Sequence, residues 1–326
     1  MDDSREILFE KRSSATVRPP PSKTYRARPG HRGRVISIPA LCSAATDARS
    51  AKPRLETDLL RAIEQRELTL FYQPQFHVDD GRVCGVEVLA RWFLPGGAVI
   101  DPCVFIPLAE QTNLIGALGA WVLREACQSD SSWQTNETES IPLCVNVSPL
   151  QINAEFPGVV QRALDVTGFP ANRLELEITE SELIGNGDVI LDCFRQLKTM
   201  GVRIAIDDFG SGYSSLSYLS RLPVDRLKLD KSLVHNLTTH WRDVAILRAI
   251  IGLGTELGVA VIAEGVETEQ QFQVLKQLGC AQVQGYLFAS PAPQKEALLM
   301  AARRWGARQT LPLESNCALR EYLHAS

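Results

Sequence analysis

The sequence predicts an α/β fold in which strands close into a barrel, and three observations support this prediction. Short apolar runs of strand length alternate with segments of helical spacing, which favours a parallel sheet. The strand-like runs number eight, the strand count of a closed β/α barrel. The first two runs are joined by Asp79-Asp80-Gly81, a hairpin signal. We therefore expect a TIM-like (β/α)8 barrel whose first strand is antiparallel.

The segment before the predicted barrel differs from the rest of the chain. Residues 1–55 carry 12 basic and 5 acidic side chains, a net charge of +7, whereas the remaining 271 residues carry −11. This head is rich in proline and has no hydrophobic period, so it cannot build a core. The sequence predicts a disordered leader over residues 1–54. It is either a solvated segment or a basic arm for nucleic acid, anionic lipid or a partner protein.

The elements are expected in order from a first helix at Leu55, where apolar spacing is helical and Thr57 and Asp58 lie near the start. Strands are expected at residues 68–77, 83–91, 143–147, 174–178, 202–206, 226–229, 259–263 and 281–283. Helices are expected between them at residues 159–166, 189–200, 244–257 and 269–278. An open doubly wound sheet is the alternative, but no G-x-G-x-x-G turn follows an early strand.

Composition excludes several classes of protein. The chain of 326 residues has 34 basic and 38 acidic residues, so as a whole it is not a tight nucleic-acid binder. No apolar window of about 18 residues is free of charge, and we expect no membrane-spanning helix. Eight scattered cysteines without a C-x-x-C pair argue against a disulfide scaffold or zinc ribbon. We expect a cytoplasmic protein.

Polar side chains lie at one end of seven successive predicted strands. The carboxyl ends of the strands of a β/α barrel meet at one face, where active sites are built. Seven carboxylates would converge there: Glu87, Glu177, Glu180, Asp207, Asp208, Glu264 and Glu267. Arg91, Asn146, Lys228 and Gln284 come from the same strands, and Lys228 is the main nearby cation.

Such a cluster of carboxylates limits the chemistry of the site. Carboxylates a few ångströms apart repel one another, so either several carry protons or cations bind between them. Oxygen ligands together with the amide of Asn146 suit Mg²⁺ or Mn²⁺. None of the five histidines is followed by aspartate, which argues against a His-Asp phosphohydrolase and against zinc. The Gly- and Ser-rich segment 209–215 is typical of a loop that closes over substrate.

The motifs also occur in a characteristic order. They are Glu87-Val-Leu89, Asn146-Val-Ser148, Glu177-Ile-Thr-Glu180, Asp207-Asp-Phe-Gly210, Lys228-Leu-Asp230, Glu264-Gly-Val-Glu267 and Gln284-Gly-Tyr286. This order resembles the EAL-domain cyclic di-GMP phosphodiesterases over residues 55–299. The resemblance implies an EAL-type barrel over residues 55–305 and a tail over residues 306–326. It also implies hydrolysis of cyclic di-GMP to linear pGpG, and a homodimer.

The resemblance also assigns roles to residues. One metal would be held by Glu87, Asn146, Glu177 and Asp207, and a second by Asp207, Asp208 and Glu264. Lys228 would hold the attacking water or a phosphate oxygen, so Glu87, Asp207, Lys228 and Glu264 are the expected catalytic residues. Gln73, Arg91 and Gln284 would contact substrate, and Glu180 and Glu267 would hold the neighbouring loops.

Two departures from the family pattern remove no ligand: Val88 stands for the signature alanine, and Ser211 stands where threonine is common. Two rival functions stay open at this point. One is a catalytically inactive cyclic di-GMP receptor of the same fold. The other is an unrelated metal-dependent barrel enzyme.

Overall fold

The computed structural model of the chain describes residues 35–36, 48–65, 67–94, 98–129, 141–180, 187–210, 219–237, 240–301 and 305. For residues 35–36, 48–54 and 187 it describes the backbone alone. The expected disorder of the remaining leader, the loop residues 211–215 and the tail over residues 306–326 lie outside the described residues.

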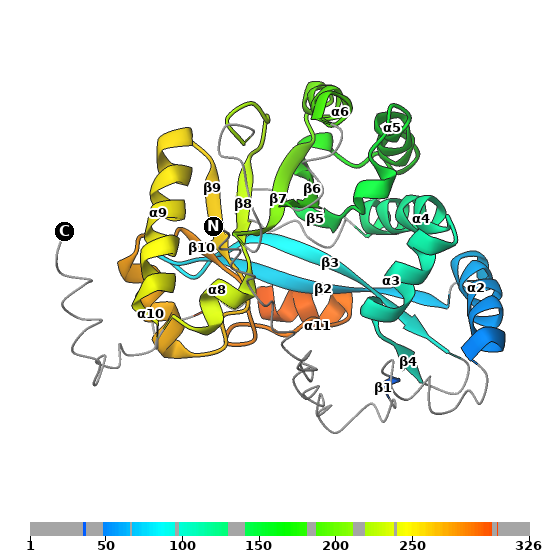
Figure 1. Cartoon of the computed structure of the whole chain (residues 1–326), viewed down its shortest axis with the longest axis horizontal. Coiled ribbons are helices and arrows are strands. Elements are labelled where there is room, and N and C mark those ends of the chain that lie inside the picture. The colour runs from blue at the N-terminus through cyan, green and yellow to red at the C-terminus, as the bar shows by residue number, and fades with distance from the viewer. Residues whose placement is uncertain are drawn as a thin grey trace, which may run out of the picture. The chain divides into compact units, whose positions relative to one another are not determined.

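Within the described residues, one sheet contains eight strands that close into a barrel, and this closure confirms the predicted fold (Figure 1). Around the barrel the strands are β3 (Val83–Phe93), β2 (Leu68–His77), β10 (Gln282–Val283), β9 (Ala260–Ala263), β8 (Arg226–Leu229), β7 (Arg203–Phe209), β6 (Leu174–Thr179) and β5 (Leu143–Asn146). Pairing of β5 with β3 closes the ring, so the open-sheet alternative is wrong. Strand β2 is antiparallel to both of its neighbours, as the hairpin signal predicted.

Two short strands extend the sheet beyond the barrel. Strand β4 (Val99–Ile100) pairs antiparallel with the end of β3 at Trp92 and Phe93, and β1 (Val35–Ile36) pairs parallel with β4. Neither was predicted, because two residues are too few to show an alternating pattern.

The helices lie outside the strands in Figure 1. They are α2 (Ala48–Gln65), α3 (Pro102–Gln111), α4 (Ile115–Gln128), α5 (Phe156–Thr167), α6 (Gly187–Thr199), α8 (Lys231–His235), α9 (Trp241–Leu257), α10 (Glu269–Gln277) and α11 (Gln294–Ala301), with 3₁₀ turns at Pro149–Gln151 and Ala171–Arg173. The first helix begins before the expected position at Leu55. Helices α3, α4, α8 and α11 were not predicted.

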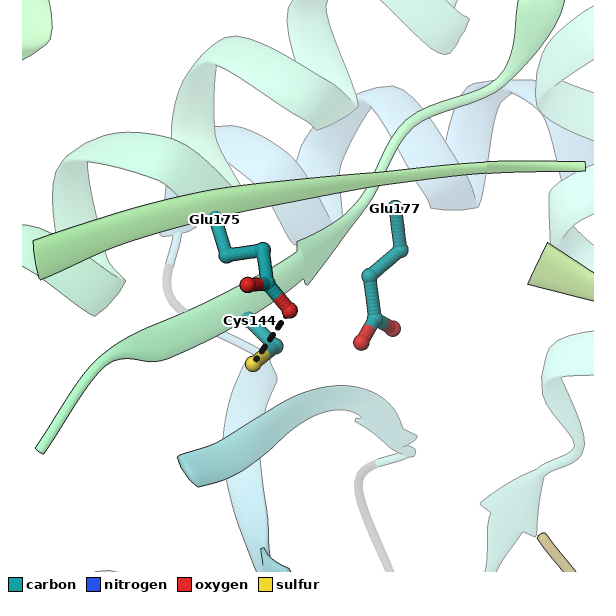
Figure 2. A group of neighbouring side chains, drawn as sticks. All are labelled: Cys144, Glu175 and Glu177. Carbon is teal, nitrogen blue, oxygen red and sulfur yellow. Dashed lines mark hydrogen bonds between the residues drawn. The ribbon is translucent and has the colours of Figure 1, made fainter. Parts of the chain in front are cut away.

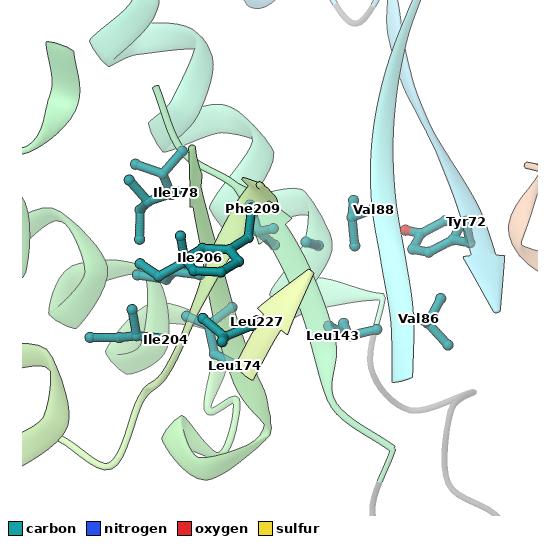
Figure 3. Packing of buried hydrophobic residues seen from close by; sticks show 14 of the residues in the cluster. Tyr72, Val86, Val88, Leu143, Leu174, Ile178, Ile204, Ile206, Phe209 and Leu227 are labelled. Carbon is teal, nitrogen blue, oxygen red and sulfur yellow. The ribbon is translucent and has the colours of Figure 1, made fainter. Parts of the chain in front are cut away.

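The strands place apolar side chains outward and polar side chains inward, because successive residues of a strand point to opposite faces. Outward residues such as Val86, Val88, Ile204 and Ile206 are buried in the apolar layer drawn in Figure 3. The residues between them carry the polar groups, as Figure 2 shows for Glu175 and Glu177, which project to the same side of β6. The interior of the barrel is therefore polar and charged.

Two expectations about protein class can be compared with the described residues. None of their helices is both long enough and apolar enough to cross a membrane. Their six cysteines are free thiols, which agrees with the absence of a disulfide pattern in the sequence.

Gly285 provides a test of how closely the strand ends approach one another. A Cβ at this position would lie 2.1 Å from the carbonyl oxygen of Val266. Gly285→Ala should therefore lower the free energy of unfolding by about 2 kcal/mol, measured by urea denaturation. Gly252→Ala is the control. Apart from the neighbouring residues and backbone of its own helix, no heavy atom lies within 4 Å of the position that a Cβ would take, so alanine should stabilise α9 by roughly 0.5–1 kcal/mol. Equal effects of the two substitutions would contradict the close approach.

Candidate active site

The site is centred on the Lys228 side chain of β8, which is completely buried. Its Nζ lies 2.6 Å from Glu177 Oε2, 2.7 Å from Glu264 Oε1, 3.2 Å from Asp207 Oδ1 and 3.9 Å from Glu87 Oε1. Burial alone would lower the pKa of Lys228, but the surrounding carboxylates, Glu177 foremost, hold this pKa well above its ordinary value. Lys228 is therefore a fixed positive charge within a ring of carboxylates.

The carboxylates of this ring exceed the cation they surround. Among the described residues, four carboxylates face one ammonium, so the fully ionised cluster would carry a formal charge of −3. Burial raises the pKa of Glu177 well above its usual value and that of Glu264 to about 8. These shifts reflect the cost of keeping several negative charges together in a space with little water.

One buried oxygen of the cluster supports cation binding directly. Oε1 of Glu177 is buried and accepts no hydrogen bond from the residues that the structure describes. A buried acceptor without a donor, next to surplus negative charge, is well suited to a metal ion. The oxygen-rich donor set suits Mg²⁺ or Mn²⁺. The residues present therefore fit a divalent cation.

Asn146 and Asp208 extend the cluster toward its exposed rim. Asn146, at the end of β5, donates from Nδ2 to Glu87 Oε1 over 2.8 Å, so its Oδ1 is the atom suited to a cation. Asp208 has a left-handed backbone with φ of 53°, and its N–H donates to Asp207 Oδ1 over 2.8 Å. Burial, the charge of Asp207 and a hydrogen bond with Asp230 raise the pKa of Asp208 to about 6.

Two of the three predicted substrate-binding residues adjoin Glu87. Gln284 donates from Nε2 to Glu87 Oε2 over 2.5 Å and to Gln73 Oε1 over 3.0 Å. Arg91 lies on the same strand as Glu87 and is placed differently. Its guanidinium lies 5.6 Å from the centre of the Phe71 ring, and it donates to the carbonyl of the adjacent residue 90.

The two residues expected to hold loops make different contacts. Glu180 is buried, and its Oε2 accepts a 2.7 Å hydrogen bond from the N–H of Gly210, where the Gly- and Ser-rich segment begins. Glu267 is exposed, and its backbone N–H donates to Gln271 Oε1 at the start of α10.

Sequence reasoning missed a second polar layer beneath the Lys228 cluster. The atoms that could bind a metal, Sγ of Cys144 and one carboxylate oxygen each of Glu175 and Glu177, lie within 4.8 Å of one another. Figure 2 shows the thiol of Cys144 hydrogen-bonded to Glu175. Glu175 Oε1 lies 3.2 Å from Arg226 Nη1, and Glu175 Oε2 lies 3.6 Å from Arg203 Nε. Arginine already neutralises Glu175, and burial raises the pKa of Cys144 well above its usual value, so the thiol stays protonated. We therefore assign Glu177 to the Lys228 cluster and regard Cys144 and Glu175 as structural.

The spacing of polar residues along the strands was the signal that could have revealed this second layer. Glu175 and Arg226 each lie two residues before a residue of the upper cluster, Glu177 and Lys228 respectively. Alternate residues of a strand share a face, so Glu175 and Arg226 had to share the interior.

Comparison with known proteins identifies the family of this barrel. The EAL domain profile matches residues 56–291. The chain belongs to the EAL domain family. It is 43% identical over 246 residues to the bifunctional diguanylate cyclase/cyclic di-GMP phosphodiesterase MucR of Pseudomonas aeruginosa, covering 75% of this chain and 36% of that protein. It is 40% identical over 239 residues to the oxygen sensor protein DosP of Escherichia coli, covering 73% of this chain and 30% of that protein.

The chain thus spans about a third of the length of these curated relatives. Among solved structures, it is similar to the PaMucR phosphodiesterase in complex with c-di-GMP. The TM-score is 0.71 at 43% identity, with 74% of this chain and 99% of that chain covered. The EAL domain of Mycobacterium smegmatis DcpA gives a TM-score of 0.61 at 35% identity, with 73% and 97% covered.

The surplus negative charge around Lys228 predicts that divalent cations stabilise the fold. After treatment with EDTA, added Mn²⁺ should raise the Tm, because a ligand at 100 times its Kd contributes about 2.7 kcal/mol of stability. Glu177→Gln should reduce this rise, whereas Glu256→Gln on the exposed surface of α9 should leave it unchanged. Differential scanning fluorimetry measures both effects. An equal rise in Tm in the two variants would contradict a cation site at Glu177.

Proposed function

We propose that this chain hydrolyses cyclic di-GMP to linear pGpG with Mg²⁺ or Mn²⁺ at the Lys228 cluster. The observation that carries the proposal is the convergence of four carboxylates on one buried ammonium at the barrel centre. Relatives named as cyclic di-GMP phosphodiesterases, MucR and NbdA of Pseudomonas aeruginosa, share 43% and 41% identity with the chain and support the choice of substrate.

The carboxylates would hold the metals, and the resemblance to the family suggests two groups of ligands. Glu87, Asn146, Glu177 and Asp207 would hold one cation, and Asp207, Asp208 and Glu264 would hold a second. When bound, two divalent cations lower the pKa of a water and stabilise the leaving oxygen of an in-line displacement. Without cations, the carboxylates of the cluster would repel a phosphodiester, which carries one negative charge.

Lys228 has a role that depends on its fixed position. Its ammonium stays charged, and its three donors face Glu177, Glu264 and Asp207. If cations held these carboxylates, the ammonium would be able to orient an attacking water or a phosphate oxygen as negative charge develops. Complete burial keeps the Nζ atom in place among its partners.

The contacts with substrate would come from the edge of the cluster. Arg91 is partly exposed on the strand that carries Glu87, and a guanidinium can bind a phosphate through two parallel hydrogen bonds. Gln73 and Gln284 are buried beside Glu87, where their amides are hydrogen-bonded to each other, to Glu87 and to the carbonyl of Ala289. Contact with the ligand would use the second amide hydrogen of Gln73 and the second lone pair of Gln284 Oε1.

Incubation of the purified chain with cyclic di-GMP and Mg²⁺ or Mn²⁺ should yield pGpG, detected by chromatography. Asp207→Asn should lower kcat by about 10³-fold, because it removes a negative charge that would help to hold both cations. Excess EDTA should abolish turnover, and added metal should restore it. Asp192→Asn, at an exposed position of α6, is the matched control and should keep native turnover. Full activity in excess EDTA would exclude a metal-dependent reaction.

Glu264→Gln should separate hydrolysis from binding, because Glu264 contacts Lys228 but is not hydrogen-bonded to Gln73 or Gln284. The variant should lose turnover by a far larger factor than it loses affinity. Enzyme assays and isothermal titration calorimetry on the same preparation measure the two quantities. If the native chain bound cyclic di-GMP tightly but formed no pGpG with either Mg²⁺ or Mn²⁺, the result would instead favour the inactive receptor.

A further inference from the structure

We propose that Gln75 is a positioning residue which fixes the orientation of Glu87 by acting through Gln284. Gln75 is completely buried in β2, two residues before the end of that strand and outside the Lys228 cluster. The proposal rests on the proposed function in one respect, namely that Glu87 is a cation ligand.

The argument begins at Arg226, whose guanidinium can only donate hydrogen bonds. Arg226 Nη1 donates to Gln75 Oε1 over 2.6 Å. The single proton of the Cys144 thiol is nearer to Glu175 Oε1, at 3.5 Å, than to Gln75 Oε1, at 3.7 Å, so Arg226 is the donor that decides. This donor requires the oxygen of the Gln75 amide to point toward it. The Nε2 group of Gln75 must then point the other way.

The same logic passes to the next amide. Gln75 Nε2 donates to Gln284 Oε1 over 2.9 Å, so Gln284 presents its Nε2 to Glu87 Oε2 and Gln73 Oε1. Gln73 in turn donates from Nε2 to the carbonyl of Ala289 over 2.9 Å. Each of these amides therefore takes its orientation from the one before. Arg226 sets the direction of the whole series of hydrogen bonds.

The chain of amides fixes Glu87 because the reversed arrangement is unfavourable. If Gln284 were reversed, its Oε1 would lie against Glu87 Oε2, and two acceptors would face each other without a proton between them. Glu87 would then turn away from Asn146 and Lys228, which it now contacts through Oε1. The carboxylate holds its place between two amide donors only while Gln284 keeps its present orientation.

Gly85 supports the proposal independently. It lies opposite Gln75 in the β2–β3 ladder. A Cβ there would lie 2.3 Å from Gln75 Oε1 and 3.4 Å from Arg226 Nη1. The φ of Gly85 is not in the left-handed region, so its backbone does not require glycine. The absent side chain leaves the space in which Gln75 and Arg226 meet.

Gln75→Glu is the decisive variant, because it keeps the size of the side chain and the contact with Arg226 but removes the donor. Gln284 must then turn its Nε2 toward residue 75 and its Oε1 toward Glu87. Gln282→Glu is the matched control: it makes the same change at another buried glutamine, two residues before Gln284, that is not hydrogen-bonded to Gln75 or Gln284. Gln75→Met removes the donor without adding charge.

Crystal structures and Mn²⁺ titrations followed by the shift in Tm give two readouts that do not need turnover. In Gln75→Glu, we expect Glu87 to leave hydrogen-bond distance of Gln284, and the Mn²⁺ concentration at half-maximal shift to rise about tenfold. Gln75→Met should give a smaller rise, and Gln282→Glu should keep both native values even if its Tm is lower.

An unmoved Glu87 in Gln75→Glu, with a native Mn²⁺ midpoint, would overturn the proposal. If Gln75→Glu does not fold, Gln75→Met decides by the same two measurements, and a native result there would likewise overturn it. Absence of pGpG with a native Mn²⁺ response would contradict the proposed function but leave this test intact. Absence of any Mn²⁺ response in the native chain would contradict the metal site, and the position of Glu87 in the crystal structures would then decide.

Discussion

A lysine ammonium without access to water must be surrounded by negative charge, and Lys228 meets this requirement at the centre of the barrel. The carboxylates that surround it come from β3, β6, β7 and the residue after β9. They meet only because closure of the sheet brings these strand ends to one face. The fold and the site therefore depend on the same interaction, since a change in strand register would leave a buried charge unpaired.

The interior of the barrel has two layers with different charge balance. In the lower layer, Glu175 lies near Arg203 and Arg226, so positive charge is sufficient. In the upper layer, Lys228 is the single ammonium among four carboxylates of the described residues. Cations are therefore expected only in the upper layer, around Lys228. The lower layer, around Glu175 and Arg226, is suited to orienting the side chains of the upper layer.

The exposed rim of the site contains a backbone feature that its neighbours stabilise. Asp208 adopts a left-handed conformation, which is uncommon for a residue with a side chain. Its N–H bonds to Asp207 and its carboxyl group bonds to Asp230, and two residues later the N–H of Gly210 bonds to Glu180. These hydrogen bonds hold the turn that presents both aspartates of the pair. Strain of this kind is often found at functional sites.

The sequence by itself determined the barrel fold, its antiparallel strand and the polar residues at the strand ends, because the count and alternation of the strands and the hairpin signal are local features. The period of two also placed Glu175 and Arg226 inside the barrel, but this signal was missed. It did not reveal α3 and α4, because Pro107 and Gly119 oppose helix formation. Close packing requires glycine at position 119, since a Cβ there would lie 1.9 Å from Gln151 Nε2. Only the tertiary structure decided which oxygens approach Lys228 and which way the buried glutamines point. These features depend on register between strands far apart in the sequence, and on an arginine that donates hydrogen bonds and cannot accept them.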